Sequence, residues 1–121
     1  MDDIDGDQLR GHLSTLVLAA LEAGEAHGLE IIHRLESRGS GVLKLREGSL
    51  YPALYRLEAQ GLVTSSVAPQ PKGARGAPRR VYRLTRKGRG ALTTGRQQWQ
   101  TFVEVVGTLL QPPAVGDLAC E

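Results

Sequence analysis

The stretch GSLYPALYRLEAQG, residues 48–61, decides the fold. Leu50, Leu54 and Leu57 fall at positions i, i+4 and i+7, so a helix carries them along one side. A single apolar stripe of this kind is typical of a helix that packs one face on a core and leaves the other face in solvent. We therefore expect the three leucines to be buried and the residues between them to face outward.

Proline and glycine set the expected limits of this helix. Pro52 would interrupt a helix interior, but within the first turn its missing N–H costs little. The helix is therefore expected to begin near Gly48 or Ser49. Glycine is common just after a helix, so the helix is expected to end before Gly61.

Two shorter helical patterns precede this stretch. Apolar residues recur at helical spacing over residues 13–21, and Asp5 or Asp7 could cap that helix. A second pattern begins at about His27 and ends in the Gly-Ser-Gly loop at 39–41. Short helices joined by tight loops predict a helix-turn-helix.

The pattern changes after residue 61. The segments LVTSSVA (62–68) and RRVYRLT (79–85) contain β-branched residues with partial alternation, which is typical of strands. The intervening PQPKGARGAP (69–78) is rich in proline, glycine and basic residues. Two strands around a long basic tip predict a hairpin, and a hairpin after a helix-turn-helix is a wing.

A long helix is expected next, capped by Thr85 and running to about Leu110, before two prolines stop it. Two sets of residues recur every seven positions along it, and Val103 and Leu110 widen the stripe: Leu92, Trp99 and Val106, then Gly95, Phe102 and Leu109. Such an apolar face needs a partner, either the first helix of the same chain or the same helix of a second subunit. We expect a dimer in which both contacts occur.

The predicted fold is mainly α with a β-hairpin wing (α+β), a winged helix-turn-helix followed by a long dimerisation helix. The expected winged helix-turn-helix spans residues 8–84 and the dimerisation helix residues 85–111. The acidic N-terminus, 1–7, and the tail, 112–121, are expected to be disordered.

Charge is unevenly distributed along the chain. The net charge is only +2, yet the interval between Glu58 and Glu104 holds nine lysines and arginines and no acidic residue. Uncompensated positive charge of this kind creates a field suited to a polyanion. A solvated surface or a flexible tail can have the same composition.

Other features exclude several classes of protein. The single cysteine, Cys120, allows no intrachain disulfide, which agrees with a reducing cytoplasm. The start MDDIDGDQ is acidic, unlike a signal peptide, and no apolar run reaches the ~18 residues of a membrane helix. The histidines lack an i, i+4 pair, and no nucleophile elbow or phosphate loop is present. We expect a cytoplasmic protein with no metal, cofactor, membrane contact or enzymatic activity.

Three segments resemble the PadR family of bacterial transcriptional regulators: LVLAALEAGEAHGLEIIHRL (16–35), LREGSLYPALYRLEAQGLV (45–63) and RRVYRLTRKGRGAL (79–92). The second is the most specific, because a proline at the head of a recognition helix is uncommon outside the family. With one C-terminal helix, the chain resembles the short branch, in which that helix and the first helix form the dimer interface. Leu29 stands where the family usually has an aromatic residue, which is expected to alter packing near the DNA-facing end of the second helix.

The resemblance also implies an effector pocket between the two subunits, where a tryptophan stacks on flat apolar molecules. Trp99 is the matching residue here, although it could instead pack the dimer core with Phe102. The residues expected at the dimer interface or effector pocket are Leu13, Val17, Trp99, Phe102, Val103 and Val106.

A winged helix places its third helix in the major groove and its wing against the backbone or the minor groove. The residues predicted to contact DNA precede the third helix, lie on its outer face or belong to the wing: Lys44, Ser49, Tyr51, Pro52, Tyr55, Arg56, Lys72, Arg75, Arg79 and Arg80. Arg56 could bind guanine or phosphate, and Ser49 and the tyrosine hydroxyls could hold phosphate oxygens. Alternatively, the tyrosines pack against the wing, Arg56 pairs with Glu58 or Glu47, and the wing is solvated.

The sequence therefore predicts a homodimeric DNA-binding repressor that binds an inverted-repeat operator in double-stranded DNA. A small aromatic effector at the dimer interface is expected to release it. The alternative is a winged-helix module that binds a protein partner and no DNA.

Overall fold

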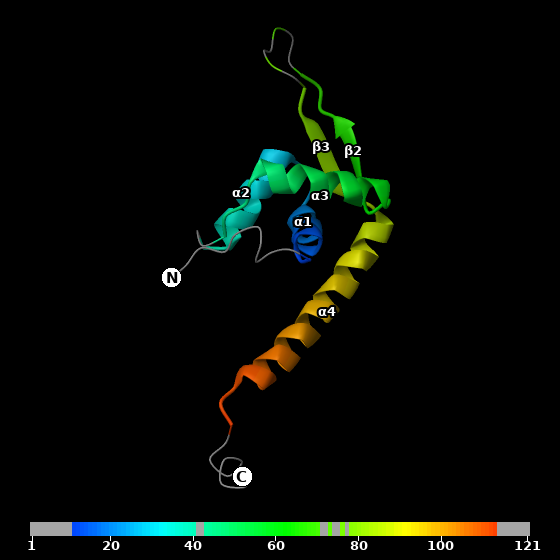
Figure 1. Ribbon diagram of the computed structural model, residues 1–121. Coiled ribbons are helices and arrows are strands. Elements are labelled where there is room, and N and C mark those ends of the chain that lie inside the picture. The colour runs from blue at the N-terminus through cyan, green and yellow to red at the C-terminus, as the bar shows by residue number, and fades with distance from the viewer. Residues whose placement is uncertain (1–10, 41–42, 71–72, 74–75, 77, 114–121) are drawn as a thin grey trace.

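The computed structural model describes residues 11–40, 43–70, 73, 76 and 78–113. Within them, four helices and three strands follow the order α1 (Leu13–Leu21), β1 (Ala26–His27), α2 (Gly28–Arg38), α3 (Glu47–Ala59), β2 (Val63–Val67), β3 (Arg80–Leu84) and α4 (Arg86–Leu110). Figure 1 shows α1, α2 and α3 gathered at the base of the β2–β3 hairpin, with α4 extending away as a long arm. The predicted fold class, a winged helix-turn-helix with a long C-terminal helix, is confirmed. The expected disordered segment 1–7 and residues 114–121 of the expected tail lie outside the described residues.

Two helices begin within one or two residues of the predicted positions, but the cap of α1 and the turn of α3 that contains Pro52 differ from the prediction. His12 is the N-cap residue of α1, and the expected caps Asp5 and Asp7 lie outside the described residues. Helix α3 begins at Glu47, so Pro52 is its sixth residue and not part of its first turn. The proline removes the N–H that would bond to the carbonyl of Gly48. Because Gly48 is exposed, water can replace that bond, and the helix tolerates proline there.

The predicted end of α3 is confirmed. Gly61 follows the helix with φ of 76°, in the left-handed region that glycine enters without steric cost. The Leu62 N–H donates to the carbonyl of Leu57 at 2.9 Å, and the Gly61 N–H donates to the carbonyl of Glu58 at 3.0 Å. These bonds satisfy carbonyls at the end of α3 and turn the chain into β2.

The wing belongs to a three-stranded antiparallel sheet in the order β1-β3-β2. Strand β2 pairs with β3 from Val63↔Leu84 to Val67↔Arg80, which confirms the predicted hairpin. Strand β1 adds Ala26↔Tyr82 on the other side of β3. A two-residue strand is too short to show alternation, so the sequence did not predict β1.

The core lies where α1, α2 and α3 meet the inner face of the sheet. The three leucines of the α3 stripe are at most 1% exposed, which confirms their predicted burial. They pack in one cluster with residues from every other helix and from the sheet: Val17, Leu18, Leu21, Ile31, Leu35, Val63, Tyr82, Leu84 and Leu92.

Helix α4 is anchored at its first turn. The Thr85 hydroxyl accepts a hydrogen bond from the Gly88 N–H at 3.0 Å, as its predicted role of helix cap requires. Gly88 itself is buried, and the Leu62 carbonyl oxygen fills the space that a Cβ at this position would need. Only glycine allows the backbones of α4 and of the α3–β2 turn to approach this closely.

Candidate nucleic-acid interface

The side of α3 that faces away from the core carries the residues that the sequence singles out. The structure places all five at least partly in solvent: Ser49, Tyr51, Pro52, Tyr55 and Arg56. Tyr55 is 79% exposed, whereas Tyr51 is 41% exposed and its phenol lies against Gly28 at the start of α2. Tyr51 is therefore fixed between two helices, while Tyr55 is free to reach a ligand.

Two adjacent wing arginines lie on opposite faces of the sheet, because successive residues of a strand alternate. The Arg80 Nη1 donates to the Ser65 hydroxyl at 3.1 Å, within the β2–β3 hairpin. The Arg79 Nη1 lies 2.8 Å from the His27 Nε2, at the N-cap of α2. The other two wing residues predicted to contact DNA lie outside the described residues: Lys72 and Arg75.

The contact between Arg79 and His27 is one that a ligand can readily displace. The Glu30 N–H donates to the His27 Nδ1 at 3.2 Å, so a neutral imidazole carries its proton on Nε2. That proton suits the Glu30 carboxylate, 3.1 Å from Nε2, but it faces the N–H groups of Arg79. Among the described residues, Arg79 has no acceptor in that arrangement, and a phosphate oxygen would supply one.

Arg80 is held more firmly, through a residue that sequence reasoning missed. Ser65 accepts from Arg80 and donates its own proton to the Glu58 carboxylate at 2.5 Å. The sequence suggested only that Glu58 pairs with Arg56. A serine in a strand carries no pattern of its own, so nothing in the sequence singles out Ser65.

Several exposed basic residues lie just before α3 and at the start of α4. The Lys87 Nζ donates to the Gln60 carbonyl at 2.9 Å, where its charge complements the C-terminal end of α3. This contact accounts for one positive charge at the otherwise unfavourable start of α4. Lys44 and Arg46, before α3, are exposed.

Tyr82 lies beside the Glu58–Ser65 pair and is 7% exposed. Burial raises the pKa of Tyr82 above its ordinary value of 10, and the nearby negative charge of Glu58 adds to the increase. A group whose pKa is raised on folding stabilises the protein below its unfolded pKa, and this stabilisation is lost as pH rises through the folded pKa.

An alkaline titration followed by tyrosinate absorbance is therefore expected to show one of the three tyrosines ionising last. The free energy of unfolding is expected to fall over the same pH range. Tyr82→Phe should abolish the late step and leave the other two. A late step that persists in this variant would assign the raised pKa to another tyrosine.

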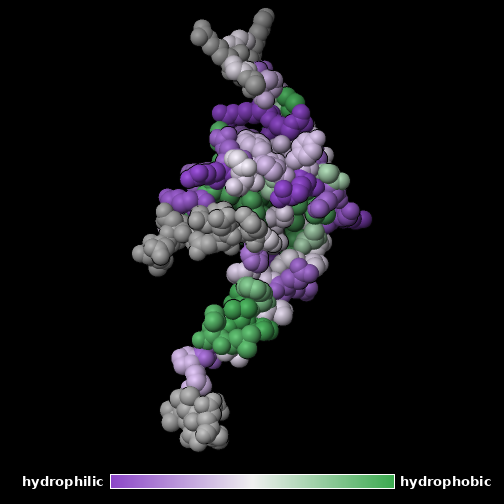
Figure 2. Space-filling view, viewed as in Figure 1, coloured by the Kyte–Doolittle hydropathy of each residue, from purple (hydrophilic) through white to green (hydrophobic). Residues whose placement is uncertain are grey.

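The far part of α4 presents an apolar face to solvent, visible as the green patch on the arm in Figure 2. Trp99, Phe102 and Val103 are 48%, 49% and 46% exposed, and Leu109 and Leu110 are more exposed still. The Trp99 and Phe102 rings stack with centroids 5.6 Å apart, and the His12 ring packs against Trp99 in a T-shaped contact with centroids 4.9 Å apart. Apolar residues gathered on one helix face in this way typically mark a contact surface.

Three residues of the predicted interface set are less exposed than this apolar face of α4. Leu13 and Val106 are half-buried. Val17 has no exposed surface and packs in the core of its own chain, so it cannot line a surface pocket in this conformation. Leu13 and Val17 both occupy apolar positions of α1, and helical spacing alone does not show which of the two is fully buried.

Helix α1 holds α4 at two points. Arg96 forms a bidentate ion pair with Glu22, at 2.7 and 2.9 Å, and this guanidinium holds the pKa of the Glu22 carboxyl below its ordinary value. The second contact involves Gly95, the residue before Arg96. The Thr15 side chain lies where a Cβ on Gly95 would be, which indicates a close approach of the two helices. The direction of the α4 arm relative to α3 therefore depends on its contact with α1.

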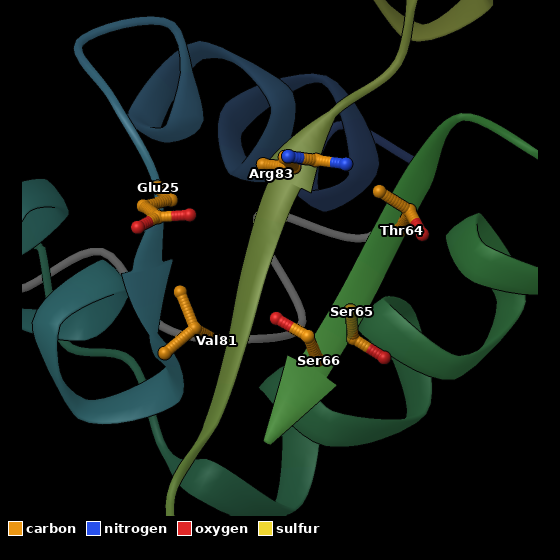
Figure 3. Close-up of a pocket in the computed structure, with 6 residues that line it drawn as sticks. All are labelled: Glu25, Thr64, Ser65, Ser66, Val81 and Arg83. Carbon is orange, nitrogen blue, oxygen red and sulfur yellow. The ribbon is translucent and has the colours of Figure 1, made fainter. Parts of the chain in front are cut away.

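The outer face of the sheet contains a pocket of about 80 Å³, shown in Figure 3 between side chains of β2, β3 and Glu25. Drug-sized ligands need about 300 Å³ or more. The pocket has room for only a few water molecules.

None of the helices built from the described residues has both the length and the apolar character that a membrane crossing requires. Among the same residues, no three histidine, cysteine, aspartate or glutamate side chains come together as a metal site.

The comparisons with known proteins agree with this arrangement. The model of the family described as "Transcriptional regulator PadR-like family" matches residues 17–94. The transcriptional regulator Rv3488 of Mycobacterium tuberculosis is 39% identical over 84 residues, which cover 69% of this chain and 72% of that protein.

Solved structures show the same relationship. A transcriptional regulator from Clostridium thermocellum has a TM-score of 0.78 at 25% identity, over 89% of this chain and 99% of that one. A PadR family transcriptional regulator from Eggerthella lenta has a TM-score of 0.74 at 32% identity, over 88% of each chain. The matched family segment includes α2, α3 and the wing, and so contains the candidate interface. This chain therefore belongs to the PadR-like family of transcriptional regulators.

Proposed function

We propose that the protein is a homodimeric repressor that binds an inverted-repeat operator in double-stranded DNA. The observation that carries this proposal is the placement of the exposed α3 side chains beside the wing arginines. Glu58, on α3, is linked through Ser65 to Arg80, so the recognition helix and the wing form one surface. The wing half of that surface belongs to the stretch between Glu58 and Glu104, which holds nine basic residues and no acidic one.

In this proposal, α3 enters the major groove and the wing reaches the backbone or the adjacent minor groove. Tyr55 and Arg56 project from the exposed side of α3 and meet base edges or phosphates. Arg79 moves from His27 to a phosphate or into the minor groove, while Lys44 binds the backbone ahead of the helix. Nothing in this activity makes or breaks a covalent bond, and it needs no cofactor; it takes place in the cytoplasm.

The proposed dimer forms through the apolar face of α4 together with α1. Trp99, Phe102 and Val103 are half-exposed in one chain and carry no charge, so a second copy would remove a large apolar area from water. A two-fold dimer presents two copies of α3, and the operator then has two half-sites about one helical turn apart or slightly more.

Repression follows if the bound dimer blocks access of polymerase to the promoter. A flat apolar or aromatic effector that stacks on Trp99 between the subunits would change the separation of the two α3 helices and release the DNA. Allosteric coupling of about 1–3 kcal/mol would weaken operator binding by about 5- to 150-fold.

Fluorescence anisotropy tests the DNA-binding proposal. The probes are DNA from upstream of the protein's own gene and a scrambled fragment of equal length, each at several salt concentrations. The wild-type protein is expected to prefer the native fragment and to lose affinity steeply as salt rises, because phosphate contacts release counterions. Arg79→Ala/Arg80→Ala removes two arginines from each subunit of the proposed dimer, so it should weaken binding about tenfold or more and reduce the salt slope by about 4.

Arg38→Ala is the matched control. Arg38 is an exposed arginine at the opposite end of α2 from His27, so its loss lowers the net charge without touching the interface. It is expected to change binding less than twofold, since only residues at the interface neutralise phosphates. No binding to either fragment by a folded dimer at low salt would overturn the proposal and favour a winged-helix module that binds a protein partner.

A further inference from the structure

Glu58 is unexpected on a surface that binds DNA. Between Glu47 and Glu104 it is the only acidic residue in the sequence. It lies at i+3 from Tyr55 and i+7 from Tyr51, on the same exposed side of α3. A carboxylate there repels phosphate, so electrostatics alone predicts that the protein would bind DNA better without it.

The contacts of Glu58 indicate what the carboxylate does. A serine hydroxyl has one proton to donate and lone pairs to accept. Ser65 donates that proton to the Glu58 Oε2 at 2.5 Å and accepts from the Arg80 Nη1 at 3.1 Å. Both hydrogen bonds involve an ionised partner, and each polarises the hydroxyl in the direction that strengthens the other.

This chain of bonds fixes Arg80 without using up its capacity to bind. Arginine has five N–H donors, and the bond to Ser65 occupies one of them. The other four make no hydrogen bond to the described residues, so a phosphate group can bind them. An arginine already held in one orientation loses less conformational freedom on binding than a free one, so its contacts contribute more affinity.

The chain of bonds also joins three elements that contact the DNA in different places. Glu58 belongs to α3, Ser65 to β2 and Arg80 to β3. The bonds therefore hold the wing at one position relative to the recognition helix. Arg79, by contrast, has within the described part of the chain only the easily displaced contact with His27. Of the two adjacent arginines, Arg80 is thus the one that is already oriented before DNA binds.

We propose that Glu58 and Ser65 are positioning residues that hold Arg80, and with it the wing, in register with α3 for sequence-specific DNA binding. This inference rests on the proposed function. It assigns a favourable role to an acidic side chain that lies within the DNA-binding surface.

The test uses the full-length dimer and the same two DNA fragments. Glu58→Ala and Ser65→Ala are each expected to weaken binding to the native fragment about fivefold and to leave binding to scrambled DNA nearly unchanged or, for Glu58→Ala, tighter. Glu58→Gln keeps an acceptor oxygen at the same reach and is expected to recover part of the specific affinity. Added to Arg80→Ala, Ser65→Ala should cost nothing more, because the two residues act as a unit.

Ser66→Ala is the matched control, because Ser66 is the next residue of β2 and its side chain lies on the outer face of the sheet, with Val81. Melting temperatures within about 2 °C of wild type, for a protein of this size, establish that each variant is folded. Tighter binding of Glu58→Ala to both fragments, or a Ser65→Ala variant that behaves like Ser66→Ala, overturns the positioning role alone. A wild-type protein that binds neither fragment overturns the proposed function, and the positioning role with it.

Discussion

Gly88→Ala is expected to lower the free energy of unfolding by about 2 kcal/mol, the cost typical of forcing an extra carbon into a packed site. The added methyl group would meet the Leu62 carbonyl oxygen, which is backbone and cannot rotate away. That carbonyl also accepts the Thr85 N–H at 3.2 Å, so a shift that relieves the clash weakens the cap region of α4. Thermal and chemical denaturation at a fixed protein concentration measure the change, since the stability of the proposed dimer would depend on concentration.

Gly90→Ala is the control for this prediction. Gly90 lies two residues further along the same helix, is exposed, and has no atom within 4 Å of the position that a Cβ would take. The alanine is therefore expected to stabilise the protein by about 0.5–1 kcal/mol, through its better helix propensity alone. Equal effects at the two positions would contradict the close approach of α4 to the α3–β2 turn.

Phe102→Asp is expected to convert the proposed dimer to a monomer and to weaken operator binding about 100-fold or more, because the two half-sites would no longer be bound by one linked molecule. Phe102 is 49% exposed in a single chain, so the folded protomer tolerates the change. In the proposed dimer, the aspartate would be buried without a partner, which is strongly unfavourable. Sedimentation equilibrium measures the assembly, and anisotropy measures the loss of operator binding.

Thr101→Asp places the same charge one residue away, on an exposed position outside the apolar stripe. It is expected to remain a dimer and to bind DNA with little change. Circular dichroism of both variants should match the wild type. If Phe102→Asp still forms dimers, or if Thr101→Asp dissociates to the same extent, the α4 face is not the subunit contact.

The predicted helices and hairpin depended on short-range patterns. The leucine stripe of α3, the Thr85 cap and the β2–β3 alternation all involve residues a few positions apart, and all three predictions are confirmed. Helix α3 begins one residue before the predicted Gly48, so the prediction that Pro52 lies in its first turn was wrong. Pro52 is acceptable in the second turn because the carbonyl that it leaves unpaired belongs to exposed Gly48.

The candidate site was predicted as a set of residue types, and its internal contacts were not. Arg79 and Arg80 look equivalent in the sequence, yet they are bound to different elements and differ in how firmly they are held. Val17 has the same apolar character as Leu13 and lies one turn further on, but it is fully buried in the core. Glu58 and Ser65 became candidates only through their contact with Arg80.

The sequence by itself determined the order of the four helices and the hairpin, the apolar side of each helix and the basic character of the wing. These properties follow from spacing along the chain, since residues three, four or seven apart share a helix face wherever the helix lies. The tertiary structure decided which side chains meet: His27 with Arg79, 52 residues apart, and Glu22 with Arg96, 74 residues apart. Such pairs depend on how the helices and the sheet pack together, and no local pattern records that packing.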